Sequence, residues 1–277
     1  MQSSMSAPWL GSAPACWQAA SASTVTHLIC FDIDGTMLST KGPGANLHQH
    51  TSFRVALKEV WGVDAGLEDL EHAGMTDQMI LRELHALTQC KLPLDDAIRL
   101  AASRMVSYCA EKGDPGAGLT VLPGVVEVLR RLNASGCAVC GLVTGNLQPI
   151  AWGKLRALGL GLEAGQFVCG GFGSDAEDRA ELIRVAIARA RACLPGLRDD
   201  LQVFHVGDTP RDLQAAKNAG VRCLGVATGK FSVAELHEAS QQCGGANTQV
   251  ILEGLSDVDR VMEYFGLGEG RGSKSET

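Results

Sequence analysis

The sequence VTHLICFDIDGT at residues 25–36 joins a short apolar run to two aspartates, a glycine and a threonine. An apolar run that ends abruptly at acidic residues and glycine is typical of a buried strand followed by a functional loop. We therefore predict a buried strand at residues 25–31, with Asp32 and Asp34 directly after it.

From about residue 121 onward, short apolar runs alternate with amphipathic stretches. Strands are expected at residues 138–143, 167–169, 201–207, 221–227 and 248–252. Helices are expected from 122–124 to about 132, at 148–158, 176–193 and 210–219, and around Val258, Val261, Met262 and Phe265. This alternation predicts an α/β fold, a Rossmann-like parallel sheet with helices on both faces.

Residues 39–120 break the alternation, because their apolar residues recur at helical spacing. The three helices expected here carry Phe53, Ala56, Leu57, Val60 and Trp61, then Met79, Ile80, Leu84 and Leu87, then Ile98, Ala101, Met105 and Cys109. We predict that residues 39–120 form a helical domain inserted into a core made of residues 25–38 and 121–265. Residues 1–24 and 266–277 are expected to be flexible.

The composition argues against several classes of partner. The 277 residues carry a net charge of -7, whereas a surface for nucleic acid or for anionic membranes needs clustered Lys and Arg. No apolar run approaches the roughly 20 residues of a membrane helix. We therefore expect neither nucleic acid nor membrane as a partner.

The first residues and the cysteines bear on location. Residues 1–26 contain no charged side chain and so lack the basic region of a secretory signal. Of the ten cysteines, the pair Cys137 and Cys140 has CxxC spacing, but residues three apart on a strand point to opposite faces. Reduced cysteines in a cytoplasmic protein are expected, with plastid import as an alternative because residues 1–24 are rich in Ala and Ser.

Acidic residues follow two of the predicted strands. In an open parallel sheet, ligands bind beyond the carboxyl ends of the strands. Asp32 and Asp34 are two residues apart, and Asp208 follows a neighbouring strand, so three carboxylates should meet and repel unless a cation joins them. A hard divalent cation, Mg²⁺, is the natural partner. One carboxylate could then attack a phosphoryl group while another carries the proton of the leaving group, which is a covalent aspartyl-phosphate mechanism.

Phosphoryl transfer also needs hydrogen-bond donors and a fixed cation for the equatorial oxygens. Candidates that would bind the phosphoryl group are Gly35, Thr36, Thr144, Gly145 and Asn146. Lys154 is the candidate for the fixed cation.

Four motifs, taken in order, resemble those of the haloacid dehalogenase superfamily in its phosphoglycolate-phosphatase-like branch. They are FDIDGT at 31–36, LVTGN at 142–146, Lys154 and VGDTPRD at 206–212. The resemblance implies an Mg²⁺-dependent phosphatase that hydrolyses a small phosphorylated metabolite, such as a phosphoglycolate-like monoester, beneath a helical cap at residues 39–120. A phosphomutase or phosphonatase on the same fold, or a non-catalytic phosphate-binding regulatory protein, are the alternatives.

The resemblance also implies roles for individual residues. Asp32 would be the nucleophile, and Asp34 the general acid and base. Asp32, Asp208 and the backbone carbonyl of Asp34 would bind Mg²⁺, with Asp212 supporting the metal or Lys154. The dehalogenases proper lack the second aspartate, so Asp34 favours phosphate over halide chemistry.

Other assignments stay open at this point. Many relatives carry the motif-three lysine further along the chain, near residue 175, which makes Arg179 the rival of Lys154. Thr76 lies in GMTD at residues 74–77, which resembles a cap loop, and it either caps a helix or contacts substrate. His205 is expected to be a core histidine with its hydrogen bonds satisfied.

Overall fold

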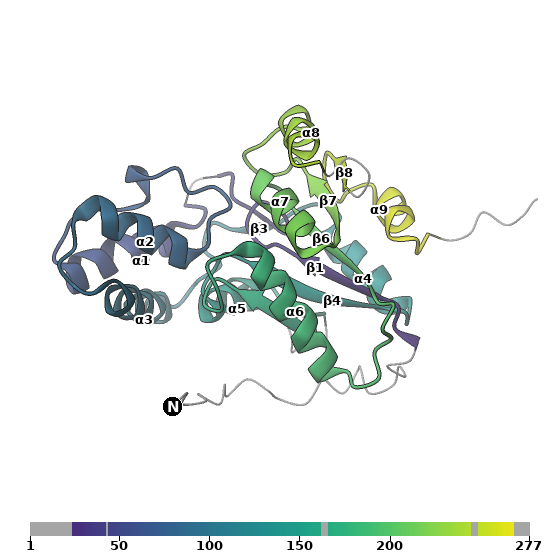
Figure 1. The fold of residues 1–277 in the computed structure, drawn as a ribbon, viewed down its shortest axis with the longest axis horizontal. Coiled ribbons are helices and arrows are strands. Elements are labelled where there is room, and N and C mark those ends of the chain that lie inside the picture. The colour runs from purple at the N-terminus through teal and green to yellow at the C-terminus, as the bar shows by residue number, and fades with distance from the viewer. Residues whose placement is uncertain (1–23, 43, 162–165, 245–248, 269–277) are drawn as a thin grey trace, which may run out of the picture.

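The computed structural model describes residues 24–42, 44–161, 166–244 and 249–268, and its centre is a six-stranded parallel sheet (Figure 1). The strands lie in the order β5-β4-β1-β6-β7-β8, with bounds β1 His27–Phe31, β4 Ala138–Thr144, β5 Cys169–Phe172, β6 Gln202–Gly207, β7 Arg222–Val226 and β8 Gln249–Leu252. All residues of β1 are buried, and the strand pairs with β4 on one side and β6 on the other. The predicted α/β fold with a parallel sheet is confirmed.

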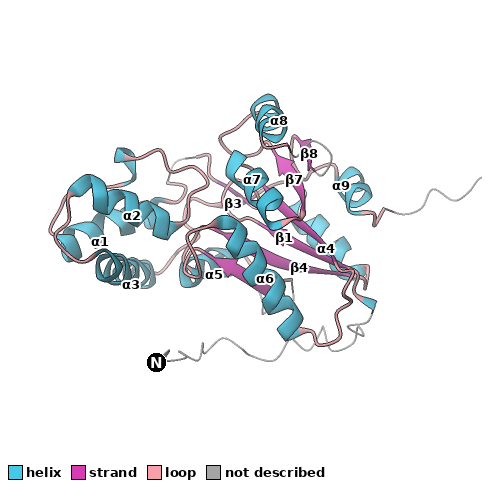
Figure 2. Ribbon diagram, in the orientation of Figure 1, coloured by secondary structure: helices cyan, strands magenta, loops and turns pink. Residues whose placement is uncertain are grey.

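Helices cover both faces of this sheet (Figure 2). Their bounds are α4 Val125–Ala134, α5 Gln148–Ala157, α6 Arg179–Cys193, α7 Pro210–Ala219, α8 Val233–Gln242 and α9 Val258–Phe265. One apolar cluster joins α4, α5 and α9 to the β1 side chains on one face of the sheet, such as Ile29. A second cluster joins α6, α7 and α8 to the β1 side chains on the other face, such as Leu28. Each helix therefore buries one apolar stripe against the sheet.

The chain leaves the sheet after β1 and returns before α4 through a short antiparallel pair, β2 Leu38–Ser39 with β3 Thr120–Val121. Between them lie α1 Leu47–Ala56, a π-helical turn Leu57–Trp61, a 3₁₀ turn Leu67–Asp69, α2 Asp77–Thr88 and α3 Leu94–Lys112. These helices stand beside the sheet in Figure 1 and pack around a core of their own that includes Phe53, Leu84 and Met105. We call residues 40–119 the helical segment.

Several predicted bounds differ from the structure. Helix α6 begins at Arg179 and not at 176, because the Asp178 carboxylate caps it by accepting from the backbone N–H of Ala180. Strand β5 begins at Cys169, two residues later than the predicted start at 167, and ends at Phe172. Helix α8 was not predicted, and the reason is its weak apolar signal, since Leu236 is its one fully buried apolar side chain.

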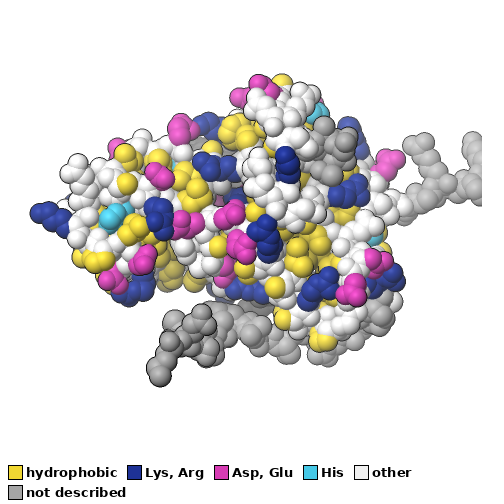
Figure 3. All heavy atoms as spheres, in the orientation of Figure 1, with side chains coloured by type: hydrophobic (Ala, Val, Ile, Leu, Met, Phe, Trp, Pro, Cys, Tyr) yellow, Lys and Arg dark blue, Asp and Glu magenta, His cyan; other side chains and the backbone are white. Residues whose placement is uncertain are grey.

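The remaining sequence predictions concern cysteines, chain ends and surface charge. The cysteines in the described part of the chain are free, and Cys140 is buried in β4 while Cys137 precedes it. Residues 1–23 and 269–277 lie outside the described residues. Among the helices that the structure describes, none is long and apolar enough to cross a membrane. On the face drawn in Figure 3, basic and acidic side chains are interspersed, without a large patch of one sign.

Candidate active site

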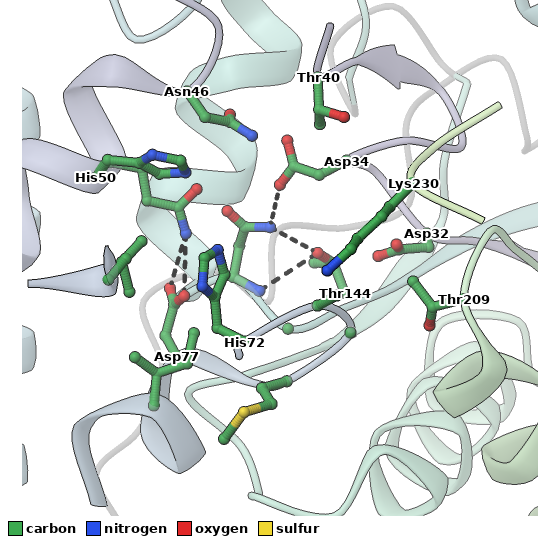
Figure 4. Close-up of a pocket in the computed structure, with 18 of the residues that line it drawn as sticks. Asp32, Asp34, Thr40, Asn46, His50, His72, Asp77, Thr144, Thr209 and Lys230 are labelled. Carbon is green, nitrogen blue, oxygen red and sulfur yellow. Dashed lines mark hydrogen bonds between the residues drawn. The ribbon is translucent and has the colours of Figure 1, made fainter. Parts of the chain in front are cut away.

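A cavity of about 260 Å³ lies at the carboxyl ends of the central strands (Figure 4). Asp32 and Asp34 line it after β1, Thr144 at the end of β4 and Asp208 after β6. The sequence argument placed these residues together because parallel strands end at the same edge of a sheet, and the structure brings them together there. The opposite wall of the cavity comes from the helical segment.

Asp32 lies against a buried guanidinium. Arg179 Nη2 is 2.8 Å from Asp32 Oδ1, and Arg179 Nε is 2.7 Å from Asp212 Oδ1. Burial raises the pKa of Asp32 to about 6, although Arg179 opposes the rise. Arg179 is therefore the cation beside the first aspartate, which the sequence had offered as the rival of Lys154.

Asp208 packs closely against the turn that follows β1. Its Oδ1 accepts a hydrogen bond of 3.1 Å from the Thr36 hydroxyl. Gly35 has a φ of +82°, and a Cβ there would lie 2.4 Å from Asp208 Oδ2, so glycine is required at this position both for its backbone conformation and for space. Burial, and then the charges of Asp212 and Asp32, raise the pKa of Asp208 well above its ordinary value.

The donor set formed by these carboxylates fits a divalent cation. One carboxylate oxygen from each of Asp32, Asp208 and Asp212 lies within 4.8 Å of the others. The charge of Asp212 raises the pKa of both Asp32 and Asp208, and the charge of Asp32 raises that of Asp208 further, so Arg179 does not neutralise this acidic group fully. Two buried carboxylates with an excess of negative charge suit Mg²⁺, a hard ion that prefers oxygen ligands.

Asp212 differs from the other two carboxylates because both of its oxygens already have partners. Oδ2 accepts from the backbone N–H and the hydroxyl of Thr209, at 3.0 and 2.6 Å, in a capping box at the start of α7. Oδ1 contacts Arg179 and, at 2.8 Å, His205 Nε2. Burial would raise the pKa of Asp212, but Arg179 and His205 hold it well below the usual range. Asp212 thus orients Arg179.

His205 matches its prediction only in part. It is fully buried in β6, as expected of a core histidine, and Nε2 is bonded to Asp212. Its Nδ1 has no hydrogen-bond partner within the described residues, so the ring is satisfied at one nitrogen and not at both.

Asp34 lies in a separate set of contacts, centred on Lys154. Lys154 Nζ is 2.7 Å from Asp34 Oδ2 and 3.0 Å from Oδ1, and the Asn146 amide donates to the same carboxylate at 2.7 Å. Burial would raise the pKa of Asp34, but these two partners lower it below its ordinary value. The structure therefore gives each aspartate its own cation, Arg179 for Asp32 and Lys154 for Asp34.

The loop after β4 is organised by the buried hydroxyl of Thr144. Its Oγ1 accepts from the backbone N–H of Asn146 at 3.3 Å and from the Asn146 side-chain amide at 2.9 Å. Gly145 approaches the helical segment so closely that a Cβ would lie 2.5 Å from the carbonyl oxygen of Met75. Of the five residues predicted to bind a phosphoryl group, Thr144, Gly145 and Asn146 line the cavity, whereas Gly35 and Thr36 are not among its lining residues.

Thr76 begins α2 as its N-cap, one of the two roles that the sequence left open. Its hydroxyl oxygen accepts from the backbone N–H of Met79 at 3.2 Å, and the hydroxyl donates to the carbonyl of Glu177. A direct contact with substrate stays a prediction. The next residue, Asp77, lines the cavity, and burial raises its pKa to about 7.

The sequence argument missed the residues that the helical segment contributes to the cavity. Gln49, His50, His72 and Asp77 line it, and Lys230 reaches it from the loop after β7 (Figure 4). Lys230 follows a predicted strand, so the rule that ranked Asp208 could also have found it. No pattern in the sequence marks the others, because their approach depends on how the helical segment packs.

Curated relatives resemble most of the chain. A phosphoglycolate phosphatase of Agrobacterium fabrum (strain C58) is 29% identical over 212 residues, which is 76% of this chain and 84% of the relative. A phosphoglycolate phosphatase of Pseudomonas putida is 28% identical, over 74% of this chain and 71% of the relative.

Solved structures and a family model complete the comparison. A hydrolase from Pseudomonas syringae has a TM-score of 0.60 at 19% identity, over 88% of this chain and all of that chain. CbbY from Rhodobacter sphaeroides, in complex with phosphate, has a TM-score of 0.57 at 19% identity, over 84% of this chain and 96% of that chain. At these identities the likeness concerns the fold. The model for haloacid dehalogenase-like hydrolases matches residues 26–220, well over half of the sequence, and the chain therefore belongs to that family of hydrolases.

Proposed function

We propose that the protein is an Mg²⁺-dependent phosphatase that hydrolyses a small phosphate monoester through a phospho-Asp32 intermediate. The observation that carries the proposal is the division of the site into two aspartates with separate partners. Asp32 lies beside Arg179 and Asp208, as a nucleophile that receives a phosphoryl group requires. Asp34 lines the same cavity with its own partners and can carry a proton.

In the first step, an oxygen of Asp32 attacks phosphorus, the ester P–O bond breaks, and the leaving oxygen takes a proton from Asp34. Arg179 stays beside the attacking carboxylate and balances the negative charge that gathers there. Mg²⁺, when bound by Asp32, Asp208 and the backbone carbonyl of Asp34, would supply positive charge for the phosphoryl oxygens.

In the second step, water attacks the phosphorus of phospho-Asp32, and Asp34 takes the proton. Phosphate leaves and Asp32 is regenerated. Lys154 lowers the pKa of Asp34 and so favours the carboxylate form that this step uses. The negative charge of a bound ester raises the pKa of Asp34 again, which favours the protonated form that the first step uses.

The cavity and the relatives indicate the size of the substrate. A volume of about 260 Å³ is below the roughly 300–1,000 Å³ of sites for larger ligands. Two relatives are named phosphoglycolate phosphatases, which supports a small phosphorylated metabolite such as phosphoglycolate as substrate. Residues 39–120 would act as the cap that excludes water and larger esters.

Phosphate release from a panel of small phosphate esters, with Mg²⁺ and with EDTA, tests the proposal. Asp32→Asn serves as the catalytic variant, and circular dichroism shows whether it is folded. We expect phosphate release that requires both Mg²⁺ and Asp32. When turnover of a ³²P-labelled ester is stopped with acid, the wild type should retain label as an acyl phosphate and Asp32→Asn should retain none.

A folded wild-type protein that releases no phosphate from any ester, with Mg²⁺ present, would contradict the proposal. Transfer of the phosphoryl group to another position of the substrate, without release, would favour a mutase. Release that persists in Asp32→Asn would exclude the phospho-Asp32 intermediate.

A further inference from the structure

The ammonium of Lys154 is buried, with 2% of its side chain exposed, and three side chains accept its hydrogen bonds. They are the carboxylate of Asp34, the amide oxygen of Asn146 at 2.9 Å and the amide oxygen of Gln49 at 2.5 Å. An ammonium has three N–H donors, so these partners satisfy it and fix its position. Gln49 differs from the other two because it belongs to α1 of the helical segment.

The orientation of the Gln49 amide is determined by its two neighbours. Its oxygen faces Lys154, and its nitrogen donates to both carboxylate oxygens of Asp77, at 3.0 and 3.3 Å. A rotated amide would turn an N–H₂ toward the ammonium and an oxygen toward the carboxylate, and both contacts would be repulsive. Asp77 is itself anchored, since it accepts from the backbone N–H of Leu147 at 2.8 Å.

These contacts form a continuous path between the helical segment and the proposed acid and base. It runs from Asp77 through Gln49 and Lys154 to Asp34, and every link is a hydrogen bond between buried or half-buried side chains. We propose that Gln49 is a positioning residue, which holds Lys154, and through it the Asp34 carboxyl, in the direction that proton transfer requires. The inference rests on the proposed function, in which Asp34 exchanges protons with the leaving oxygen and with water.

Removing the Gln49 amide would leave one N–H of the buried Lys154 without an acceptor. A buried donor without a partner is unfavourable, so the ammonium would shift toward its remaining partners or toward water. Asp34 is held through both of its oxygens by this ammonium, and it would turn with it. Proton transfer is sensitive to such a change because donor and acceptor must lie within hydrogen-bond reach.

A positioning role predicts that a Gln49 variant loses more kcat/KM on an ester with a poor leaving group than on one with a better leaving group. Breaking the ester bond of a poor leaving group depends strongly on the proton of Asp34, whereas a better leaving group depends on that proton less. Ethyl phosphate and trifluoroethyl phosphate are nearly equal in shape, but the fluorinated alcohol leaves far more readily. The value of kcat/KM reports the steps up to departure of the leaving group, so it isolates this half of the reaction.

We would measure kcat/KM on both esters for the wild type, Gln49→Met and Gln49→Asn. Methionine has a similar volume without an acceptor amide, and asparagine keeps the amide but is one methylene too short to hold both partners. Arg82→Gln is the matched control, because Arg82 joins α2 to Glu177 of the core and takes no part in the path. Circular dichroism and thermal unfolding establish that each variant is folded.

For both Gln49 variants we expect kcat/KM to fall about tenfold or more on ethyl phosphate and less than about threefold on trifluoroethyl phosphate. Arg82→Gln should change kcat/KM by the same factor on both esters. Equal losses on the two esters, or no loss on either, would overturn the positioning role. A wild type that hydrolyses neither these esters nor the wider panel would instead contradict the proposed function, so the two failures are distinguishable.

Discussion

The guanidinium of Arg179 lies 2.8 Å from the carboxylate of Asp32, and both side chains are more than nine-tenths buried. This pair joins the first turn of α6 to the end of the central strand. Asp212 contacts the same guanidinium through another nitrogen. If Arg179 moved away, the buried carboxylates of Asp32 and Asp212 would repel each other with no cation between them. The positive charge beside the proposed nucleophile is therefore fixed before any substrate binds.

Arg179→Gln should lower both stability and activity. Removing one partner of a buried ion pair typically costs about 3–5 kcal/mol in the free energy of unfolding, because the remaining charges are uncompensated. We expect urea denaturation to show a loss of this order, and kcat/KM to fall about 100-fold or more.

Arg179→Lys is the control for charge. An ammonium keeps the positive charge but cannot contact Asp32 and Asp212 through two separate nitrogens, so we expect it to recover part of the stability and little of the activity. Full activity in Arg179→Gln would show that the reaction does not need the positive charge of Arg179.

Asp208→Asn should weaken Mg²⁺ binding. Asp208 is one of the two carboxylates in the acidic group whose oxygens are not saturated by neighbouring donors, and an amide oxygen is a weaker ligand for a hard cation. We expect isothermal titration calorimetry to show a Kd for Mg²⁺ raised about tenfold or more.

An exposed carboxylate, Asp96 on α3, provides the matched control as Asp96→Asn. Its Kd for Mg²⁺ should equal that of the wild type. If Asp208→Asn binds Mg²⁺ as tightly as the wild type, the metal site must lie elsewhere.

The sequence predicted the aspartates of the site better than their partners. Asp32, Asp34 and Asp208 follow strands, so the order of strands in a parallel sheet is enough to bring them together. Arg179 and Lys154 lie on helices, and the direction of a long side chain on a helix depends on the loop before it and on packing. The sequence could therefore offer both residues but could not say which carboxylate each would meet.

The helical segment was harder still. Periodicity predicted its three helices, because the buried residues recur at helical spacing. It could not predict that Gln49 and Asp77 would reach across to Lys154 and Leu147, since these contacts depend on the angle at which two packed bodies meet. Helix α8 was missed because Leu236 is its one fully buried apolar residue, and a single residue does not make a recurring apolar pattern in the sequence.

The stability of the protein should fall as pH rises through the range set by Asp77. Burial raises the pKa of Asp77 to about 7 from an ordinary 3.8. Between these values the folded chain binds a proton at Asp77 that the unfolded chain has released, so folding is favoured at the low end of the range and this advantage is lost as pH approaches 7. At full effect the difference is about 4 kcal/mol in the free energy of unfolding.

Urea denaturation at a series of pH values between about 4 and 7 measures this dependence. The free energy of unfolding of Asp77→Asn should fall less with rising pH than that of the wild type, because asparagine does not titrate. Parallel pH profiles for the two proteins would mean that Asp77 ionises in the folded protein as readily as in the unfolded one. Asp96→Asn again serves as the control and should match the wild type.

Gly145→Ala should push the helical segment away from the loop after β4. A Cβ at this position would lie 2.5 Å from the backbone oxygen of Met75, which cannot rotate aside as a side chain could. The hydrogen bond from the backbone N–H of Asp77 to the Gly145 carbonyl would be strained by the same shift. We expect a loss of about 1–3 kcal/mol in the free energy of unfolding, measured by thermal or urea denaturation, and a higher KM.

Gly153→Ala on α5 is the comparison for this variant. Its Cβ would meet two side-chain atoms of Pro115, at 3.3 and 3.4 Å, and alanine is the better helix former, so stability should stay within about 1 kcal/mol of the wild type. A Gly145→Ala protein as stable and active as Gly153→Ala would show that the helical segment can move away at no cost.

The central place of β1 in the sheet has a consequence for biosynthesis. Both neighbours of β1 come much later in the chain, and Thr36 and Asp208, which share a hydrogen bond, are separated by 172 residues. At a synthesis rate of about 5–20 residues per second, a ribosome needs about 10–30 s to add the residues between Thr36 and Asp208. During this time the HLICF segment is an apolar strand without its β6 partner, and a chain interrupted before residue 208 carries the proposed nucleophile but lacks Asp208, the proposed Mg²⁺ ligand.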